Sequence, residues 1–433
     1  MIAILGAGVA GLAAASTLEN LGKDYVVIEK EPRIGGYSRS FKAGKFTFDF
    51  SGHLLHVNNK RTKELLAEKC PDLFDRHDRS AEIWIGDKRV PFPFQANLYH
   101  LGPQTARRVL ASYERARKKG TNRKPFKPAD SFKAFVTRTF GIEMARMFFI
   151  PYNQKLFSRS LTGITTKWTT WSVPKPSAAE IRRGALGDKT RSYGYNASFL
   201  YPSQGSIEEL PKCLAKGTRN VRIDSEAVRI DLEQKTIELS SGENIGFSSL
   251  ISTIPLPSLL RILDPRPKNY RRWHRALSAS KMLVLNLGVK GPAPTGSHWI
   301  YFPEHKWVFL RVGFYTNFAP HLAPGGCHSM YVEIGCRGGC VNEKALIKRA
   351  ECDLVSCGIL SGRNNILEEH CVVMDPAYVD YTRSRERALP EINRFLAKHR
   401  IKTAGRYGRW EYGSMDSSMA QGIEASEKSA ADI

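Results

Sequence analysis

The first 36 residues constrain this chain more than any other segment, because they join a strand, a glycine turn, a helix and a second strand. Ile2 to Leu5 is a short apolar run typical of a buried parallel strand, and the Ala-rich stretch after it predicts a helix. Between them stand Gly6, Gly8 and Gly11 in G-x-G-x-x-G spacing. This arrangement predicts a dinucleotide site at the amino end of the helix.

Each glycine of this turn has a separate physical role. Gly6 allows the tight turn, Gly8 lets the backbone approach a pyrophosphate closely, and Gly11 lets the helix pack on the strand. The helix N-terminus adds unpaired N–H groups with partial positive charge, so an anion can bind there without a basic side chain.

Two further features favour FAD over NAD. The strand expected at residues 25–28 ends at Glu29, which is placed to accept hydrogen bonds from ribose hydroxyls. The pair Gly35-Gly36 in EPRIGGYSRS resembles the flavoprotein loop that brings a second backbone segment to the FAD pyrophosphate and ribityl chain. A lone glycine motif is weak evidence, but the combination predicts an FAD-binding protein.

Length and composition limit the number of domains and the class of protein that this chain can form. At 433 residues and 42% hydrophobic content the chain can form two domains. It has no run of 18 apolar residues and no basic leader before its apolar start, so we expect neither a transmembrane helix nor a signal peptide. We therefore expect a cytoplasmic protein. The eight cysteines lack metal-ligand spacing, so free thiols and no metal site are expected.

The charge balance is unusual, with 65 Lys and Arg against 42 Asp and Glu. The densest basic stretch is ARRVLASYERARKKGTNRKPFK, with its cations between residues 107 and 127. A solvated helical face is the simplest interpretation. Steering of an anionic substrate and peripheral contact with an anionic membrane are the alternatives, and nucleic acid ranks last because no binding motif accompanies the charge.

The predicted fold is α/β, a Rossmann-type FAD-binding domain with an interleaved α+β substrate domain. A β-meander at residues 220–255 returns the chain to the first lobe, so residues 1–79, 191–264 and 400–433 are assigned to the FAD-binding domain. Residues 80–190 and 265–399 are assigned to the substrate or cap domain. Three elements are expected in the second domain: a hairpin turning at Gly86-Asp87, a helix capped by Asp130 and ending near Phe140, and paired strands in YFPEHKWVFLRVGF.

Several blocks along the whole chain resemble UDP-galactopyranose mutases of the eukaryotic and fungal type. They are FDFSGHLLHV, VPFPFQANL, PYNQKLF, YGYNASFLYPSQGSIEEL, HWIYFPEHKWVFLRVGFYTNFAP and GRYGRWEYGSMDSSMAQGIEAS. The FAD motifs are shared with the wider protoporphyrinogen oxidase and amine oxidase superfamily. The resemblance implies an intramolecular transferase or isomerase. In these mutases reduced FAD attacks a nucleotide sugar through N5, and a pyranose becomes a furanose without net oxidation.

The resemblance also implies site residues. His53 matches the histidine beside the flavin, Asn153 the Asn of P-Y-N, and Arg311 a pyrophosphate-binding Arg, while Tyr378 and Tyr412 fall near substrate tyrosines. These five are the expected catalytic residues, and the expected substrate is a small anion such as a nucleotide sugar or sugar phosphate. Replacing Arg311 by Ala is expected to weaken ligand binding by about 1.5–3 kcal/mol while FAD content is unchanged.

The C-terminal block is expected to return to the cofactor. Arg406 matches a family Arg that reaches the FAD phosphates. Asp416, Ser418 and Met419 open a helix whose N-terminus can face the flavin and stabilise negative charge on its reduced form. With Gly6, Gly8, Gly11, Glu29, Gly35 and Gly36, these four residues make up the expected FAD-binding set.

Some positions depart from the mutase pattern. A second pyrophosphate Arg aligns with Ser172 and a substrate Tyr with Phe318, which predicts a substrate other than UDP-galactopyranose itself. Basic residues near Ser172 that could replace the missing Arg are Lys167, Lys175, Arg182 and Arg183. Two alternatives therefore stay open: an FAD oxidoreductase that takes a hydride from its substrate, and a non-catalytic basic module on a flavoprotein fold.

Overall fold

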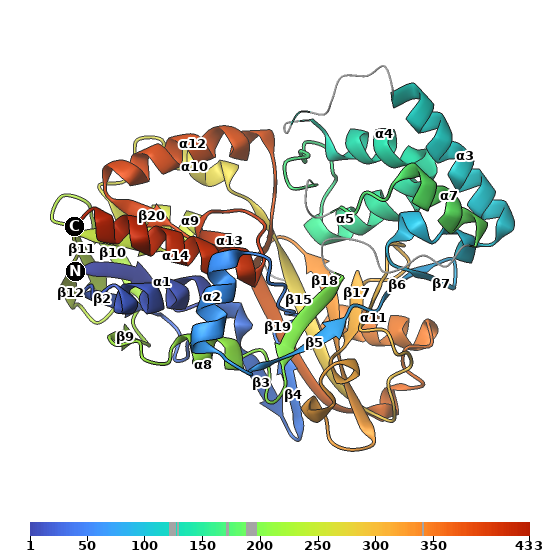
Figure 1. The fold of residues 1–433 in the computed structure, drawn as a ribbon, viewed down its shortest axis with the longest axis horizontal. Helices are drawn as coiled ribbons and strands as arrows, with labels where there is room; N and C mark the ends of the chain where they lie inside the picture. Colours follow the sequence, from blue (N-terminus) through green and yellow to red (C-terminus); the bar gives the residue numbers. More distant parts are fainter. Residues whose placement is uncertain (121–126, 128–129, 170–172, 188–196, 340–341) are drawn as a thin grey trace.

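The computed structural model describes residues 1–433 except 121–126, 128–129, 170–172, 188–196 and 340–341. Two sheets dominate it, a parallel one beside both chain ends and a larger, mostly antiparallel one, with a group of helices at the far end (Figure 1). The predicted α/β class with a Rossmann-type FAD-binding part is confirmed.

The parallel sheet carries the glycine turn. Its order is β20 (Ile401–Thr403), β13 (Ser249–Ser252), β1 (Ile2–Leu5), β2 (Tyr25–Ile28) and β9 (Val221–Arg222). The strands predicted at 2–5 and 25–28 are confirmed, and β1 lies in the middle because its side chains are apolar on both faces. Helix α1 (Val9–Asn20) follows β1, and α14 (Met415–Ala431) packs along it (Figure 1).

The expected β-meander is also present. It forms a four-stranded sheet of β12 (Asn244–Gly246), β11 (Thr236–Leu239), β10 (Ala227–Asp231) and β14 (Leu263–Asp264). Helices α9 (Leu256–Ile262), α10 (Tyr270–Ala276) and α12 (Arg383–Lys398) lie nearby. Trp273 of α10 and Ile392 of α12 share one core with Leu5 and Leu250 of the parallel sheet. These two helices thus pack with the nucleotide-binding sheet, although the sequence assigned them to the other domain.

The larger sheet lies under the second lobe. Its order is β19 (Ile366–Val379), β15 (Ala279–Lys290), β18 (Cys327–Cys336), β17 (Arg311–Phe314), β16 (Trp299–Tyr301), β6 (Ala81–Ile85) and β7 (Lys88–Pro91). The hairpin at Gly86-Asp87 joins β6 to β7 as predicted, and the paired strands in residues 301–314 correspond to β16 and β17. Helix α11 (Glu343–Ser356) shares a core with this sheet.

Helices cluster beyond β7 at the far end of the second lobe. They are α3 (Pro103–Gly120), α4 (Phe132–Met144), the π-helical turn Ala145–Phe149, α5 (Ile150–Phe157) and α7 (Ala178–Leu186). The predicted cap of α4 is wrong by one residue, since Ser131 is the N-cap and the Asp130 carboxylate accepts from Lys127 N at 2.8 Å. The basic stretch falls largely on α3, as its helical interpretation predicted.

Several short elements complete the fold. They are the hairpin β3 (Ser40–Ala43) and β4 (Phe46–Asp49), the pair β5 (Phe74–Asp78) and β8 (Ser198–Pro202), and helices α2 (Lys60–Lys69), α8 (Glu209–Leu214) and α13 (Gly405–Gly408). Cys70 after α2 is disulfide-bonded to Cys213 in α8, with a Cα–Cα distance of 5.8 Å. The expectation that all eight cysteines are free thiols is therefore wrong for this pair.

No helix in the described residues is long and apolar enough to cross a bilayer.

Candidate active site

A large pocket of about 2370 Å³ runs between the two lobes. One side of it is formed by the ends of β1 and β2, the Gly35-Gly36 loop and the block from Gly405 to Ser418. The other side is formed by β17, β18 and β19. Such a volume accommodates both a dinucleotide and a second ligand.

The glycine turns leave room for a cofactor. A side chain at Gly8 would meet no protein atom within 4 Å, whereas one at Gly11 would overlap the carbonyl oxygen of Gly6. Gly8 bridges Gly35, and a Cβ on Gly36 would lie 3.4 Å from the Gly8 Cα. The two glycine segments thus lie side by side with open space in front of Gly8, as a bound pyrophosphate requires.

The amino end of α1 fits an anion. Its N-cap, Gly8, offers no side-chain cap and the first turn holds no acidic residue, so backbone N–H groups face the pocket. Glu29 ends β2 as expected and lines the pocket, but its carboxylate already accepts from Ala7 N at 2.7 Å and Glu31 N at 2.9 Å. The backbone holds this carboxylate in place for a ribose, which can still bond its remaining lone pairs.

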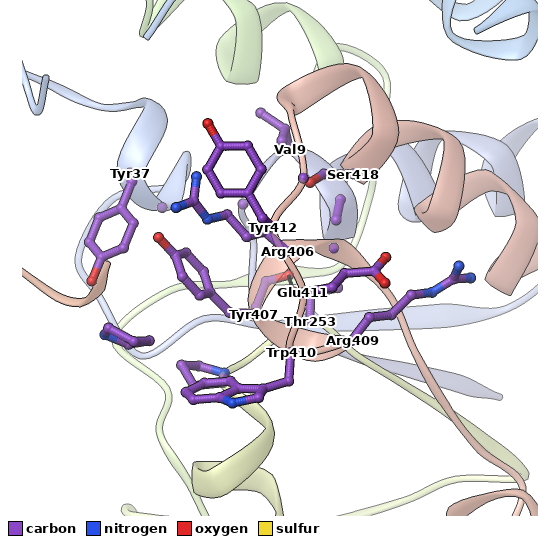
Figure 2. A pocket seen from close by; sticks show the side chains of 18 of the residues that line it. Val9, Tyr37, Thr253, Arg406, Tyr407, Arg409, Trp410, Glu411, Tyr412 and Ser418 are labelled. Atoms are coloured by element: carbon purple, nitrogen blue, oxygen red, sulfur yellow. Dashed lines mark hydrogen bonds between the residues drawn. The ribbon is translucent and has the colours of Figure 1, made fainter. Parts of the chain in front are cut away.

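Arg406 lies among aromatic rings at the pocket. Its Cζ is 4.5 Å from the Tyr412 ring centroid, 4.8 Å from that of Tyr378 and 5.4 Å from that of Tyr407. Figure 2 shows the guanidinium between the rings of Tyr407 and Tyr412. Nη2 donates to Ala377 O at 2.6 Å, whereas the buried Nε has no hydrogen-bond partner among the described residues. An unused donor of this kind suits a phosphate or a flavin oxygen.

His53 is positioned by a tight loop. Gly52 passes so close to Tyr331 that a Cβ there would overlap the phenol, and Ser51 donates a hydrogen bond to the Glu333 carboxylate. His53 Nδ1 is buried and has no partner among the described residues. Burial, with a smaller contribution from the Arg406 charge, lowers the pKa of His53 to about 4.

We therefore expect His53 to be neutral throughout the physiological pH range. In histidine NMR titrations, the resonance that His53→Asn removes should shift with a midpoint near pH 4. Because the unfolded chain takes up this proton near pH 6.5, the contribution of neutral His53 to stability should be complete above pH 6.5 and decline as the pH falls towards 4. A midpoint near 6.5 would contradict this expectation.

Arg311 lies at the pocket but is already paired. Its side chain is 18% exposed and holds Glu333, 3% exposed, through both Nε and Nη2, with Nε 2.8 Å from Oε2. The antiparallel register of β17 and β18 places the two residues directly opposite each other. Nη1 makes no hydrogen bond in the described chain, and Nη2 keeps a second N–H, so Arg311 can still offer a ligand the fork formed by Nη1 and Nη2.

Four cations line the pocket from the second lobe: Arg79, Lys167, Lys175 and Arg311. The two carboxylates that line it from this lobe are both neutralised, Glu333 by Arg311 and Asp375 by Lys281 at 2.8 Å. We call these four cations the cationic wall. An electropositive wall of this kind favours an anionic ligand and disfavours a cationic one.

The structure separates the four basic candidates for the missing Arg. Lys167 and Lys175 line the pocket, although Lys167 is paired with Glu386 at 2.6 Å. Arg182 is paired with Glu114 at 2.7 Å, and neither it nor Arg183 lines the pocket. Lys175 is therefore the best-placed replacement.

Several expected site residues lie elsewhere. Asn153 is buried and donates to Phe149 O at 2.7 Å, so the predicted catalytic contact has no support from its position. Gly11 and Met419 are buried in packing, and Asp416 accepts from Asn58 N at 3.0 Å. None of these four lines the described part of the pocket. Gly11 keeps α1 close to β1, the packing role that its place in the glycine motif predicted.

Phe318 requires a second correction. It is buried among aromatic rings, with Tyr201 at 4.9 Å and Phe199 at 5.6 Å between centroids, and it does not line the pocket. The inference that a substrate hydroxyl contact is lost there is therefore wrong. Ser172, the other departure from the mutase pattern, lies outside the described residues.

The remaining expected residues do meet at the pocket. His53, Arg311, Tyr378 and Tyr412 line it together with Gly6, Gly8, Glu29, Gly35, Gly36, Arg406 and Ser418. Tyr378 and Tyr412 are stacked, with ring centroids 5.6 Å apart. Sequence reasoning missed Arg79, Tyr407 and Glu333, which also line the pocket. Tyr407 directly follows the predicted Arg406 in GRYGRW, and Glu333 is a charged residue within an apolar strand pattern. No sequence signal marked Arg79.

Comparison with known sequences points to flavoproteins. Residues 9–357 match the profile of flavin-containing amine oxidoreductases. The chain is 30% identical over 101 residues to a probable flavin-containing monoamine oxidase A of Dictyostelium discoideum. That match covers 23% of this chain and 22% of the other protein, so the chain spans about a fifth of this curated relative.

Two solved structures are similar over nearly the whole chain. A reduced UDP-galactopyranose mutase superposes with a TM-score of 0.92 and 28% identity, covering 99% of this chain and 95% of that one. A putative protoporphyrinogen oxidase from Exiguobacterium sp. has a TM-score of 0.73 and 14% identity, covering 99% and 98%. The second likeness shows the shared fold alone.

Proposed function

The chain belongs to the flavin-containing amine oxidoreductases, and we propose that this FAD-dependent enzyme is a mutase-type isomerase of an anionic sugar. The substrate is a nucleotide sugar or a related sugar phosphate. Its pyranose and furanose forms are interconverted without net oxidation.

The cationic wall is the observation that most strongly supports this proposal. An enzyme that oxidises amines must bind cations or their neutral forms. Because the charges of Arg311 and Glu333 cancel, the net positive charge that opposes a cation comes from Arg79 and Lys175. A diphosphate, by contrast, gains charge-assisted hydrogen bonds from the same groups. The likeness to a UDP-galactopyranose mutase over 99% of the chain supports the same class of reaction.

The residues at the pocket have distinct proposed tasks. When bound, FAD in its reduced form supplies a nucleophilic nitrogen. Lys175, Arg79 and Nη1 of Arg311 hold the diphosphate and stabilise the charge that it gains as it leaves the sugar. The phenols of Tyr378 and Tyr412 are able to donate to it, and neutral His53 shapes the loop beside the flavin without supplying a proton.

The redox behaviour during turnover tests the proposal. The enzyme is incubated with a panel of nucleotide sugars and sugar phosphates, once oxidised and once reduced by dithionite without oxygen. We expect isomerised product only from the reduced enzyme, with an unchanged flavin spectrum after many turnovers. Product formation without prior reduction, or bleaching of oxidised flavin by the sugar, would contradict it.

An oxidoreductase is the second candidate, because the matched family is defined by amine oxidation. It predicts that a substrate bleaches oxidised flavin in the absence of oxygen. Amines such as putrescine therefore belong in the same panel.

Lys175→Ala is expected to weaken binding of the active anionic substrate about tenfold, which corresponds to about 1.4 kcal/mol for a lost contact of an exposed lysine with phosphate. KM should rise while FAD content and melting temperature stay unchanged. Arg183→Ala, which removes an exposed cation outside the pocket, is the matched control and should leave KM unchanged. Equal KM values for both variants would place the diphosphate elsewhere.

The prediction that UDP-galactopyranose is a poor substrate now depends on Ser172 alone, since Phe318 does not line the pocket. UDP-galactopyranose is therefore included in the panel. Rapid turnover of it by the reduced enzyme would support the mutase proposal and show that Lys175 or Arg79 replaces the absent guanidinium.

A further inference from the structure

The excess positive charge is concentrated in one part of the molecule. Residues 98–187, which we call the helical lobe, contain 18 Lys and Arg but only four Asp and Glu, whereas the whole chain carries +23. The helices of this lobe lie at one end of the molecule, away from the parallel sheet (Figure 1). More than half of the net charge thus lies on about a fifth of the chain.

Much of this charge is exposed and unpaired. The exposed cations of α3 are Arg107, Arg108, Arg115, Arg117, Lys118 and Lys119. Glu143 pairs with Arg108 at 3.2 Å, and Glu114 is shared by Arg117 and Arg182. Arg107, Arg115 and Lys119 have no ion pair in the described chain. A helix that serves only solubility usually mixes both signs of charge, so this surface suits an anionic partner.

Two exposed apolar side chains lie on the same lobe. Leu186 is 79% exposed, the highest value among the described large apolar residues, and Tyr99 is 52% exposed. A Cβ on Gly187, the residue after Leu186, would lie 2.9 Å from the Tyr99 ring. Tyr99 therefore lies beside the end of α7 that carries Leu186. Leu186 follows Arg182 by one helical turn and shares its face of α7, which is held to α3 by the Arg182–Glu114 pair.

We propose that the helical lobe docks on the surface of an anionic membrane. Leu186 and Tyr99 enter the headgroup region, and the cations of α3 lie over the lipid phosphates. Each cation near such a surface and each buried apolar group adds to the affinity, and tyrosine is favoured where an apolar and an aqueous phase meet. A soluble polyanion such as nucleic acid would explain the cations but gives no reason to expose a leucine.

Docking would also position the active site. Lys167 and Lys175 of the helical lobe line the pocket, so an enzyme held by this lobe keeps its pocket close to the membrane. This inference does not depend on the reaction proposed above, because it rests on the exposed face of the lobe.

Flotation or sedimentation with vesicles tests the proposal on the intact FAD-containing protein. Vesicles contain phosphatidylcholine alone or with about one third phosphatidylglycerol, in low salt and in about 0.5 M NaCl. We expect at least about tenfold stronger partitioning to the anionic vesicles at low salt, and loss of most of it at high salt. The flavin spectrum reports that each variant is folded.

Two pairs of variants separate the contributions. Tyr99→Ser with Leu186→Ser should lower partitioning about tenfold, while Ile223→Ser with Leu367→Ser, which alters exposed apolar residues outside the lobe, should not. The triple variant R107S, R115S and K119S should lose binding to anionic vesicles, whereas K268S, R271S and K398S, which remove as many exposed cations elsewhere, should retain it.

Three outcomes would overturn the proposal. The first is equal partitioning to neutral and anionic vesicles, or none to either. The second is binding that the Tyr99 and Leu186 variant leaves unchanged. The third is displacement of the vesicles by duplex DNA that binds more tightly than they do, which would identify the lobe as a nucleic-acid surface.

Discussion

Gly8→Val is expected to give a folded protein without FAD. The backbone at Gly8 has φ −74°, which any residue adopts, and a side chain there meets no protein atom within 4 Å. The valine would instead occupy the space that the pyrophosphate needs. A clash of this kind should cost at least about 3 kcal/mol, or more than about a hundredfold in the dissociation constant of FAD. Flavin absorbance and FAD released on denaturation measure the loss.

Two glycine variants make the result specific. Gly246→Val is the matched control, since it adds the same side chain to open space outside the pocket and should leave the protein yellow. Gly11→Val should instead unfold the nucleotide-binding sheet, because its Cβ overlaps the Gly6 carbonyl. Full FAD content in Gly8→Val would show that the cofactor lies away from this turn.

Arg311→Ala should destabilise the whole fold by about 3–5 kcal/mol. It leaves the Glu333 carboxylate buried at 3% exposure without a counter-charge and with only the Ser51 hydroxyl as a side-chain donor, and removing one member of a buried ion pair costs about that much. Denaturant unfolding of the variant and wild type measures the difference. Arg183→Ala, an exposed cation on a helix, should change stability by less than about 0.5 kcal/mol.

The double variant Arg311→Leu with Glu333→Leu tells a structural role from a ligand contact. It removes the stranded charge, so most of the lost stability should return while binding of the anionic substrate stays weak. If Arg311→Ala were as stable as the wild type, the Ser51 hydroxyl or water would be enough to stabilise the Glu333 carboxylate. The simpler expectation from the sequence, a loss of ligand affinity alone, omitted Glu333 entirely.

Most of the fold could be predicted from local sequence patterns. The strands at 2–5 and 25–28, the β-meander and the hairpin at Gly86-Asp87 follow from short-range periodicity and turn chemistry, and all are present. FAD as cofactor was also predictable, because the Gly8 turn and the Gly35-Gly36 loop are contiguous motifs whose geometry depends on the backbone.

Side-chain partners were not predictable in this way. The Arg311–Glu333 pair is set by the register between β17 and β18, which no local pattern fixes. Asn153 and Phe318 matched motif positions, yet each side chain packs away from the pocket. Matching a position fixes a place along the chain, whereas the direction of the side chain depends on tertiary packing.

The order of strands in the parallel sheet has a consequence for biosynthesis. β1 pairs with β13, which follows it by about 245 residues, and β20 joins the sheet only after residue 400. A ribosome-bound chain therefore holds its glycine turn long before the strand that completes it has been made. Until then the edge of β1 is open to other chains, so chaperone binding during synthesis would protect it. The pocket is complete only after the block from Gly405 to Ser418, which lines one side of it, has emerged from the ribosome.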